Sequence, residues 1–176
     1  MSDKKTPPIM RTSIIKAAAL FTLFFTVTLG FSQSLPINFE NDVTTSDFED
    51  FDGGTATVLA NPQSNGINTS ATVAQIVRNG GAEWSGSKIA LTSNLNFTTL
   101  GSISMKVITT APVGTTVKFK LEGNGHAERD AHTTVSNEWE TLTWDFTGEP
   151  ANFNWLVFMF DIGNVGNGSI NSTFLF

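Results

Sequence analysis

The fold class of this chain is indicated most clearly by residues 116–122, Thr116-Val117-Lys118-Phe119-Lys120-Leu121-Glu122. Apolar and charged side chains alternate strictly in this stretch, and successive side chains of a β-strand point to opposite faces. The pattern therefore predicts a strand with one buried and one exposed face. The three apolar residues are expected to face a core, and the two lysines and Glu122 are expected to face outward.

The same alternation recurs along the chain. In residues 139–146 it places Trp144 in the core and leaves Trp139 on the outer face, so that one sheet is expected to display the lysines, Glu122 and Trp139 together. Residues 155–162 are apolar on both faces, which is typical of a central strand covered on both sides. Eight runs are predicted as strands: 55–60, 71–78, 88–91, 102–109, 116–122, 138–146, 155–162 and 172–176.

From residue 34 onward no stretch combines a helical apolar period with a capped start. The sequence therefore predicts one all-β domain over residues 33–176, a two-sheet antiparallel β-sandwich of the jelly-roll type. Residues 122–130 are expected to form a long polar loop between two strands. The apolar pattern is still running at residues 173–176, so we expect the domain to be truncated at its last strand.

Composition excludes several classes of function. The chain has 10 Lys and Arg against 16 Asp and Glu, and the resulting net charge of −6 is the wrong sign for a protein that neutralises phosphates, so nucleic acid is not an expected partner. It has no Cys, which excludes disulfides, thiolate metal sites and cysteine nucleophiles. His126 and His132 are the two histidines, so histidine-rich metal sites are excluded as well.

The N-terminus has the pattern of a secretory signal peptide over residues 1–32. Basic residues precede an uncharged apolar run at residues 17–31, and this run is short for a membrane span. We expect cleavage near Ser32 and Gln33, no membrane insertion after cleavage, and a protein that is secreted or held at the cell surface. The alternative is an uncleaved anchor helix, although no basic stop signal follows the run.

Several segments of the mature chain together carry a resemblance: 37–40 (INFE), 51–58 (FDGGTATV), 66–75 (GINTSATVAQ), 84–87 (WSGS), 139–146 (WETLTWDF) and 158–163 (FMFDIG). In this order the chain resembles the jelly-roll, galactose-binding-like carbohydrate-binding modules that Bacteroidota secrete. Those modules are attached to polysaccharide-degrading enzymes, notably family 16 glycoside hydrolases such as laminarinases. The resemblance implies polysaccharide binding without catalysis, with a β-glucan as the favoured ligand and a catalytic domain as a partner in the parent protein.

Sugar binding needs flat aromatic faces that stack on pyranose rings, with a few polar groups for the hydroxyls. Trp84 lies in a glycine-flanked turn and is the first candidate platform; its alternative is a tryptophan folded back over the end of the sandwich. Trp139 is the second candidate, with a residue covering the rim of the sandwich as its alternative. Trp144 is expected in the core by alternation. Trp155 is left open.

Polar partners for a glycan are expected from the 122–130 segment and from a lysine-bearing strand face. The candidates are Glu122, His126 and Arg129 in the segment and Lys88, Lys118 and Lys120 on strands. The lysines would add local positive charge, which would suit uronic or sulfated glycans. The alternative is an ordinary solvated face, because isolated surface charges contribute little.

The resemblance also implies one structural Ca²⁺, with Glu40 matching an acidic ligand just after the first strand. Calcium prefers oxygen ligands, and Asp42 and Asp161 are further candidates. The acidic cluster at residues 47–52 does not have the spacing of an EF-hand loop, since no glutamate closes it at the twelfth position.

Catalysis is not expected of this domain. The family 16 motif Glu-x-Asp-x-x-Glu and the Gly-x-Ser-x-Gly elbow are both missing from the sequence. The competing class is a structural or adhesive β-sandwich of a secreted surface protein whose polar face meets another protein domain.

Overall fold

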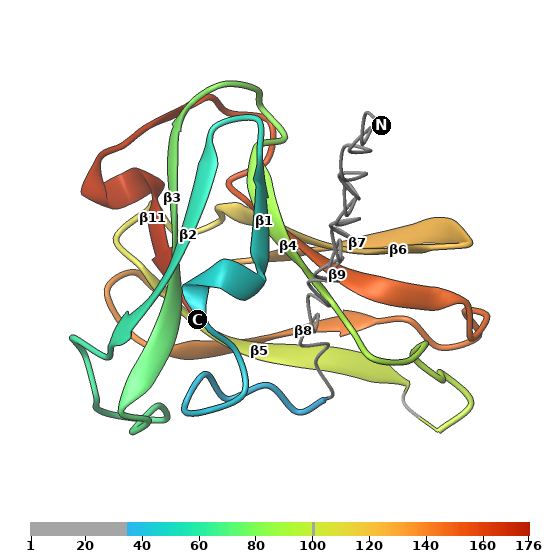
Figure 1. The fold of residues 1–176 in the computed structure, drawn as a ribbon. Coiled ribbons are helices and arrows are strands. Elements are labelled where there is room, and N and C mark those ends of the chain that lie inside the picture. The colour runs from blue at the N-terminus through green and yellow to red at the C-terminus, as the bar shows by residue number, and fades with distance from the viewer. Residues whose placement is uncertain (1–34, 100) are drawn as a thin grey trace, which may run out of the picture. The chain divides into compact units, whose positions relative to one another are not determined.

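The computed structural model describes residues 35–99 and 101–176, which fold into two antiparallel β-sheets (Figure 1). The predicted all-β, two-sheet antiparallel sandwich is thereby confirmed. The predicted signal peptide and its cleavage site near Ser32 and Gln33 lie outside the described residues.

The first sheet has five strands in the order β1-β4-β9-β6-β7. They are β1 (Phe48–Phe51), β4 (Gly86–Ala90), β9 (Phe153–Phe160), β6 (Thr116–Gly123) and β7 (Gly125–His132). The central strand, β9, is the one whose sequence is apolar on both faces, as predicted. Its outward-pointing Val157 and Met159 are buried because long lysine side chains on the neighbouring strands cover them. Val157 pairs with Lys88 and Lys120, and Met159 pairs with Lys118.

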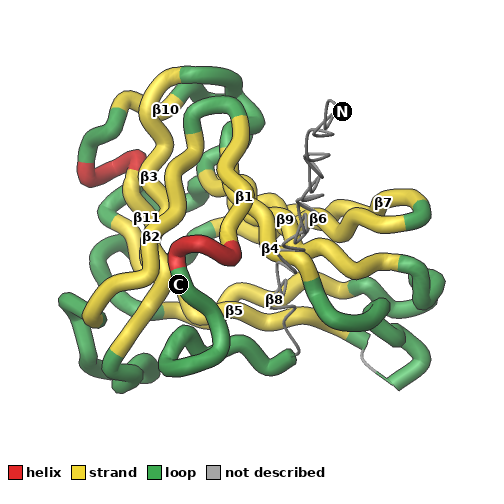
Figure 2. The backbone as a smooth tube through the Cα atoms, in the orientation of Figure 1, coloured by secondary structure: helices red, strands yellow, loops and turns green. Residues whose placement is uncertain are grey.

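The second sheet has six strands in the order β10-β3-β11-β5-β8, with β2 paired to β3 (Figure 2). They are β10 (Gly166–Asn167), β3 (Thr72–Gly80), β11 (Thr173–Leu175), β5 (Ser102–Thr109), β8 (Glu140–Asp145) and β2 (Gly54–Ala60). Two short 3-10 turns, η1 (Thr45–Asp47) and η2 (Ile170–Ser172), lead into β1 and β11.

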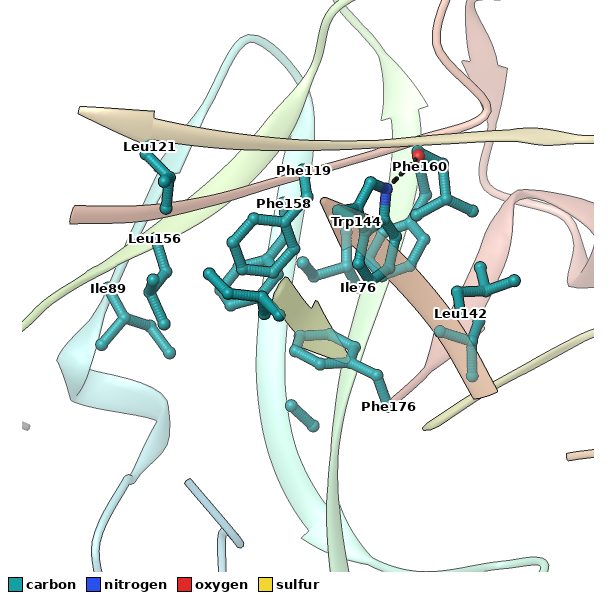
Figure 3. Packing of buried hydrophobic residues seen from close by; sticks show 14 of the residues in the cluster. Ile76, Ile89, Phe119, Leu121, Leu142, Trp144, Leu156, Phe158, Phe160 and Phe176 are labelled. Atoms are coloured by element: carbon teal, nitrogen blue, oxygen red, sulfur yellow. Dashed lines mark hydrogen bonds between the residues drawn. The ribbon is translucent and has the colours of Figure 1, made fainter. Parts of the chain in front are cut away.

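The core lies between the inner faces of the two sheets and is rich in phenylalanine (Figure 3). Val117, Phe119 and Leu121 are buried in it, as their alternation predicts. Phe119 packs against Trp144 with ring centroids 5.2 Å apart, and the Trp144 indole Nε1 donates to the Val117 carbonyl at 3.1 Å. Trp144 is thus a core residue with a satisfied polar atom, as expected.

The prediction of a long polar loop over residues 122–130 is wrong. This segment is a β-hairpin, in which β6 pairs with β7 along its whole length and the chain turns through Gly123, Asn124 and Gly125. Gly125 adopts a φ of 116°, a conformation that a residue with a Cβ rarely takes. The sequence missed β7 because it is an edge strand whose polar residues lie on both faces, so it lacks the alternation of a half-buried strand.

The expectation that the lysines and Trp139 share one sheet face is also wrong. Lys118 and Lys120 lie on β6 of the five-stranded sheet, whereas Trp139 directly precedes β8 of the six-stranded sheet. Alternation assigns a side chain to the inner or outer face of its own strand, and it does not say which sheet the strand joins.

Candidate functional site

The outer face of the five-stranded sheet gathers five of the predicted glycan-binding residues, and we call it the lysine face. Strand register aligns them in rows across the sheet. One row runs from Lys88 through Val157 and Lys120 to Glu128, and the next runs from Ala90 through Trp155 and Glu122 to His126. The lysine face comprises Glu49, Lys88, Trp155, Val157, Met159, Lys118, Lys120, Glu122, His126, Glu128 and Asp130.

Trp155 lies on the central strand of this face, at the end of the face near the start of β9, and was missed as a site residue by sequence reasoning. It is half-buried at the start of β9, between Ala90 of β4 and Glu122 of β6. The Lys88 ammonium lies 4.7 Å from the centroid of its ring, within the range of a cation–π contact. The sequence does indicate its orientation. Trp155 is two and four residues from Val157 and Met159, so it points outward as they do.

Every lysine of the lysine face is paired with a carboxylate. Lys118 Nζ lies 2.9 Å from Asp130 and 3.8 Å from Glu128. Lys120 Nζ lies 2.7 Å from Glu122, and Lys88 Nζ lies 3.1 Å from Glu49. Three ammonium groups thus stand among four carboxylates, so the face does not carry the local positive charge expected for uronic or sulfated glycans.

Trp84 forms a second, separate surface at the rim of the sandwich. Its side chain is 57% exposed in the turn between β3 and β4, and its indole Nε1 donates to Asp52 Oδ2 at 2.8 Å. β4 begins two residues after Trp84 and ends at Ala90, the partner of Trp155. The two tryptophans therefore lie at opposite ends of β4.

A buried arginine holds the turn that presents Trp84. Arg78 is fully buried, and its guanidinium donates to the carbonyls of Glu83 at 3.0 Å, Asp161 at 2.8 Å and Asn164 at 2.6 Å. Its Nε donates to Ser85 Oγ at 2.9 Å. One side chain thus ties residues 82–85 to the loop that follows β9.

Burial and charge act in opposite directions on this arginine. Burial lowers the pKa of Arg78, and the carboxylate of Asp161, 3.6 Å from its Nη1, raises it. The ordinary pKa of arginine is so high that the group stays charged at neutral pH. A charged, buried donor surrounded by carbonyls is costly to remove, because its partners would be left unsatisfied.

Two predicted site residues are not available for a glycan on the lysine face. Trp139 is only 8% exposed; it packs with Val73, Ile108 and Leu175, and its indole donates to the Gln63 carbonyl at 2.7 Å. This is the rim-covering alternative of the sequence analysis. The covering contact comes from 76 residues away in the sequence, so alternation could not reveal it.

Arg129 points to the opposite side of β7 from the lysine face, at the position paired with the core residue Phe119. Its Nε donates to the Asp145 carbonyl at 3.0 Å, and its Nη2 donates to Glu149 at 2.6 Å. It therefore ties β7 of one sheet to the end of β8 in the other, and it does not lie with the other candidates on the lysine face.

The three acidic side chains proposed as calcium ligands do not form a ligand set. Glu40 Oε1 accepts from the Ala71 amide at 2.7 Å, and the two carboxylate oxygens of Asp42 accept from the amides of Asn38 and Phe39. Asp161 pairs with Arg78 instead. Within residues 35–99 and 101–176, no three acidic or histidine side chains lie close enough to hold a metal ion. Calcium binding remains a prediction of the sequence alone.

The part of the chain that the structure describes contains no helix with the length and apolar character of a membrane span.

Comparison of the fold with solved structures shows distant likeness to carbohydrate-binding modules. The family 11 carbohydrate-binding module from Clostridium thermocellum, in complex with a β-1,3-1,4-mixed-linked tetrasaccharide, superposes with a TM-score of 0.54 at 12% identity, over 79% of this chain and 88% of that one. An exo-β-agarase matches with a TM-score of 0.54 at 9% identity over 78% of this chain, and the agarase AgWH50C with 0.50 at 10% over 79%.

The chain spans about a quarter, 24%, of each agarase, so these likenesses concern one part of a larger enzyme. No protein-family model matches the chain, and no curated protein matches it either. At such low identity the likeness shows the fold alone: this chain has the β-sandwich architecture that solved carbohydrate-binding modules have.

Proposed function

We propose that this domain is a secreted, non-catalytic polysaccharide-binding module that targets an attached or partner glycoside hydrolase to its substrate. The observation that carries the proposal is the lysine face, where Lys88, Lys118, Lys120, Glu122 and His126, each a candidate of the sequence analysis, share one sheet face with Trp155. The likeness of the fold to carbohydrate-binding modules supports it.

The lysine face has the two components that glycan binding needs. The Trp155 ring can stack on the apolar face of a pyranose once Lys88 swings off it, since an exposed cation–π contact is worth only about 0.5–1 kcal/mol. The flanking carboxylates, ammonium groups and His126 can exchange hydrogen bonds with sugar hydroxyls.

The charge balance of this face favours an uncharged glycan. Each ammonium group already has a carboxylate partner, and an anionic glycan would have to displace that partner and approach a fourth carboxylate. A neutral polymer can use the ion pairs as fixed donors and acceptors without breaking them. A β-glucan, the ligand favoured by the sequence resemblance, fits this requirement.

The exposure of Trp84 supports a second location for the glycan, at the rim of the sandwich. Its side chain is the most exposed of the tryptophans described above, and Asp52 and the turn held by Arg78 keep it in place. A rigid aromatic side chain at a loop rim loses little conformational entropy on binding.

Affinity electrophoresis separates the two locations. The exported protein and its variants Trp155→Ala and Trp84→Ala are run through gels cast with laminarin, mixed-linkage β-glucan, xylan, alginate or no polymer. We expect a neutral β-glucan to retard the parent protein, Trp155→Ala to abolish the retardation and Trp84→Ala to keep it. Loss of retardation in Trp84→Ala alone would move the site to the rim.

Free migration of the folded parent protein through every polymer would favour the structural or adhesive class instead. Circular dichroism of each sample confirms that a variant which migrates freely is still folded.

A further inference from the structure

The Lys88 ammonium stands between two partners on the outer face of the five-stranded sheet. Its Nζ lies 4.7 Å from the centroid of the Trp155 ring and 3.1 Å from Glu49 Oε1. Glu49 belongs to β1 and Trp155 to β9, and these strands flank β4, which carries Lys88. The ring and the carboxylate therefore attract the same ammonium group from opposite sides.

Strand register explains why Lys88 reaches the ring. On β4, Ala90 is the direct partner of Trp155. Lys88, two residues earlier, pairs with Val157 and is therefore a diagonal neighbour of Trp155. Long and aromatic side chains span this diagonal distance. Ala90 has no side chain beyond its Cβ, so it does not separate the Lys88 ammonium from the ring.

This contact distinguishes Lys88 from the other lysines. In residues 35–99 and 101–176, no other lysine lies over an aromatic ring. An ammonium over a ring occupies the space in which the apolar face of a pyranose would stack. The free protein therefore holds the Trp155 ring covered on one side.

Glu49 allows the ammonium to leave the ring without losing a charged partner. Its side chain is 60% exposed and lies on the edge strand β1, so the carboxylate has room to turn outward. The strand itself is anchored through Asp50, whose Oδ1 accepts from Ser87 Oγ at 2.6 Å and from the Ala56 amide at 2.9 Å. The carboxylate can thus follow the ammonium while β1 stays in place.

We propose that Lys88 and Glu49 form a gate on the glycan site. Lys88 covers the Trp155 ring in the free protein, and it moves to Glu49 when a pyranose stacks on that ring. The inference rests on the proposed function, because it takes Trp155 as the platform for the glycan. Glu49, which was not among the glycan-binding candidates, becomes part of the site.

The gate selects ligands in two ways. A sugar displaces Lys88 only if it stacks on the indole more favourably than the ammonium does, so ligands without an extended apolar face are rejected. The displaced ammonium keeps Glu49 as its partner, so opening leaves no unpaired charge and creates no attraction for an anionic glycan. A neutral polysaccharide is therefore preferred over a uronic one.

Two substitutions on opposite sides of the gate should change the affinity in opposite directions. Lys88→Thr keeps a strand-forming residue and removes the cover, so we expect binding to laminarin or mixed-linkage β-glucan to tighten about two- to fivefold. Glu49→Gln removes the carboxylate that receives the ammonium, so binding should weaken about twofold. The double variant should behave like Lys88→Thr alone, because Glu49 then has no ammonium to receive. Affinity electrophoresis at several polymer concentrations measures these changes, and Lys106→Thr on the other sheet is the matched control, expected to bind as the parent protein does.

A second measurement reports the cover without any glycan. Acrylamide quenching of fluorescence is recorded in a Trp84→Phe background, where Trp155 is the accessible tryptophan beside the buried Trp139 and Trp144. Removal of the cover in Lys88→Thr should raise the quenching constant. Glu49→Gln should lower it, because the ammonium then stays over the ring.

The two measurements separate the gate from the proposed function. Equal quenching in the parent protein and both variants, or unchanged or weaker glycan binding by Lys88→Thr, would overturn the gate. Quenching that follows the substitutions, in a protein that no polymer retards, would confirm the cover on Trp155 and contradict glycan binding instead.

Discussion

Trp155 and Trp139 both stand on the outer side of a sheet, yet one is accessible and the other is closed in. Trp155 lies among charged side chains on the lysine face and is half-buried. Trp139 lies on the other sheet, 8% exposed, where it packs with Val73 and Leu175 and donates to the carbonyl of Gln63. A loop from a distant part of the chain closes over Trp139 where neighbouring strand residues already pack on it, and strand alternation alone does not predict this.

The largest expected effect is the difference in stability between the alanine variants of these two tryptophans. Trp139→Ala removes a buried ring and leaves the Gln63 carbonyl without its donor, so we expect a loss of about 3–5 kcal/mol in the free energy of unfolding. Trp155→Ala is expected to cost about 1 kcal/mol or less, because the ring is partly solvated. Urea unfolding measures both; equal losses would remove the contrast between the two faces.

Removal of Arg78 should have the next largest effect. Arg78→Met keeps most of the side-chain volume and leaves the carbonyls of Glu83, Asp161 and Asn164 without a donor. We expect a loss of about 3 kcal/mol and a change in Trp84 fluorescence, since the turn that carries Trp84 is no longer held. Lys106→Met, on an exposed site of β5, is the matched control and should cost under about 0.5 kcal/mol. A comparable loss in both variants would contradict the role of Arg78.

The paired charges of the lysine face predict a smaller effect of salt. Since each lysine has a carboxylate partner, retention by a neutral β-glucan should change less than about twofold between about 50 mM and 500 mM NaCl. Lys118→Ala should cost under about 1 kcal/mol of stability, as partly exposed ion pairs usually do. Retention by alginate that disappears at high salt would show that the face binds anionic glycans after all.

The smallest effect concerns Asp145, on the outer face of the six-stranded sheet. Hydrogen bonds from the side chain and the backbone amide of Thr147 lower the pKa of Asp145. Its folded-state pKa lies below the unfolded value, so its contribution to stability is present above the unfolded pKa and is lost as the pH falls through the folded one.

Thermal unfolding between about pH 6 and pH 2 should therefore show a shallower acid decline in Asp145→Asn than in the parent protein. If the two proteins have parallel pH profiles, Asp145 does not contribute to the loss of stability in acid.

Much of the fold could be predicted from the sequence because half-buried strands carry their own signal. The alternation in residues 116–122 predicted that Phe119 is buried and Lys120 exposed, and the two-sided apolar run predicted the central strand β9. Edge strands give no such signal. β7 has polar residues on both faces, and its Arg129 bonds to the far sheet, so the sequence predicts a loop there.

The sequence predicts several residues of the candidate site, but it does not predict how they are arranged. Lys88, Lys120 and His126 were chosen from sequence, and strand register brings them together, but the register depends on pairings between strands far apart in the chain. Trp155 became a candidate only when those pairings placed it between β4 and β6. Trp139 is closed in by packing with Val73, Ile108 and Leu175 and by its hydrogen bond to the remote Gln63 carbonyl.

The most direct test of the central claim uses the indole N–H signals of the four tryptophans in a ¹⁵N-labelled sample. An oligosaccharide of the β-glucan that retards the protein is added stepwise, with the buried Trp139 and Trp144 as internal controls. We expect the Trp155 signal to shift with saturation while the two buried indoles stay in place. Saturable movement of the Trp84 signal with an unmoved Trp155 would contradict it and assign the glycan to the rim of the sandwich.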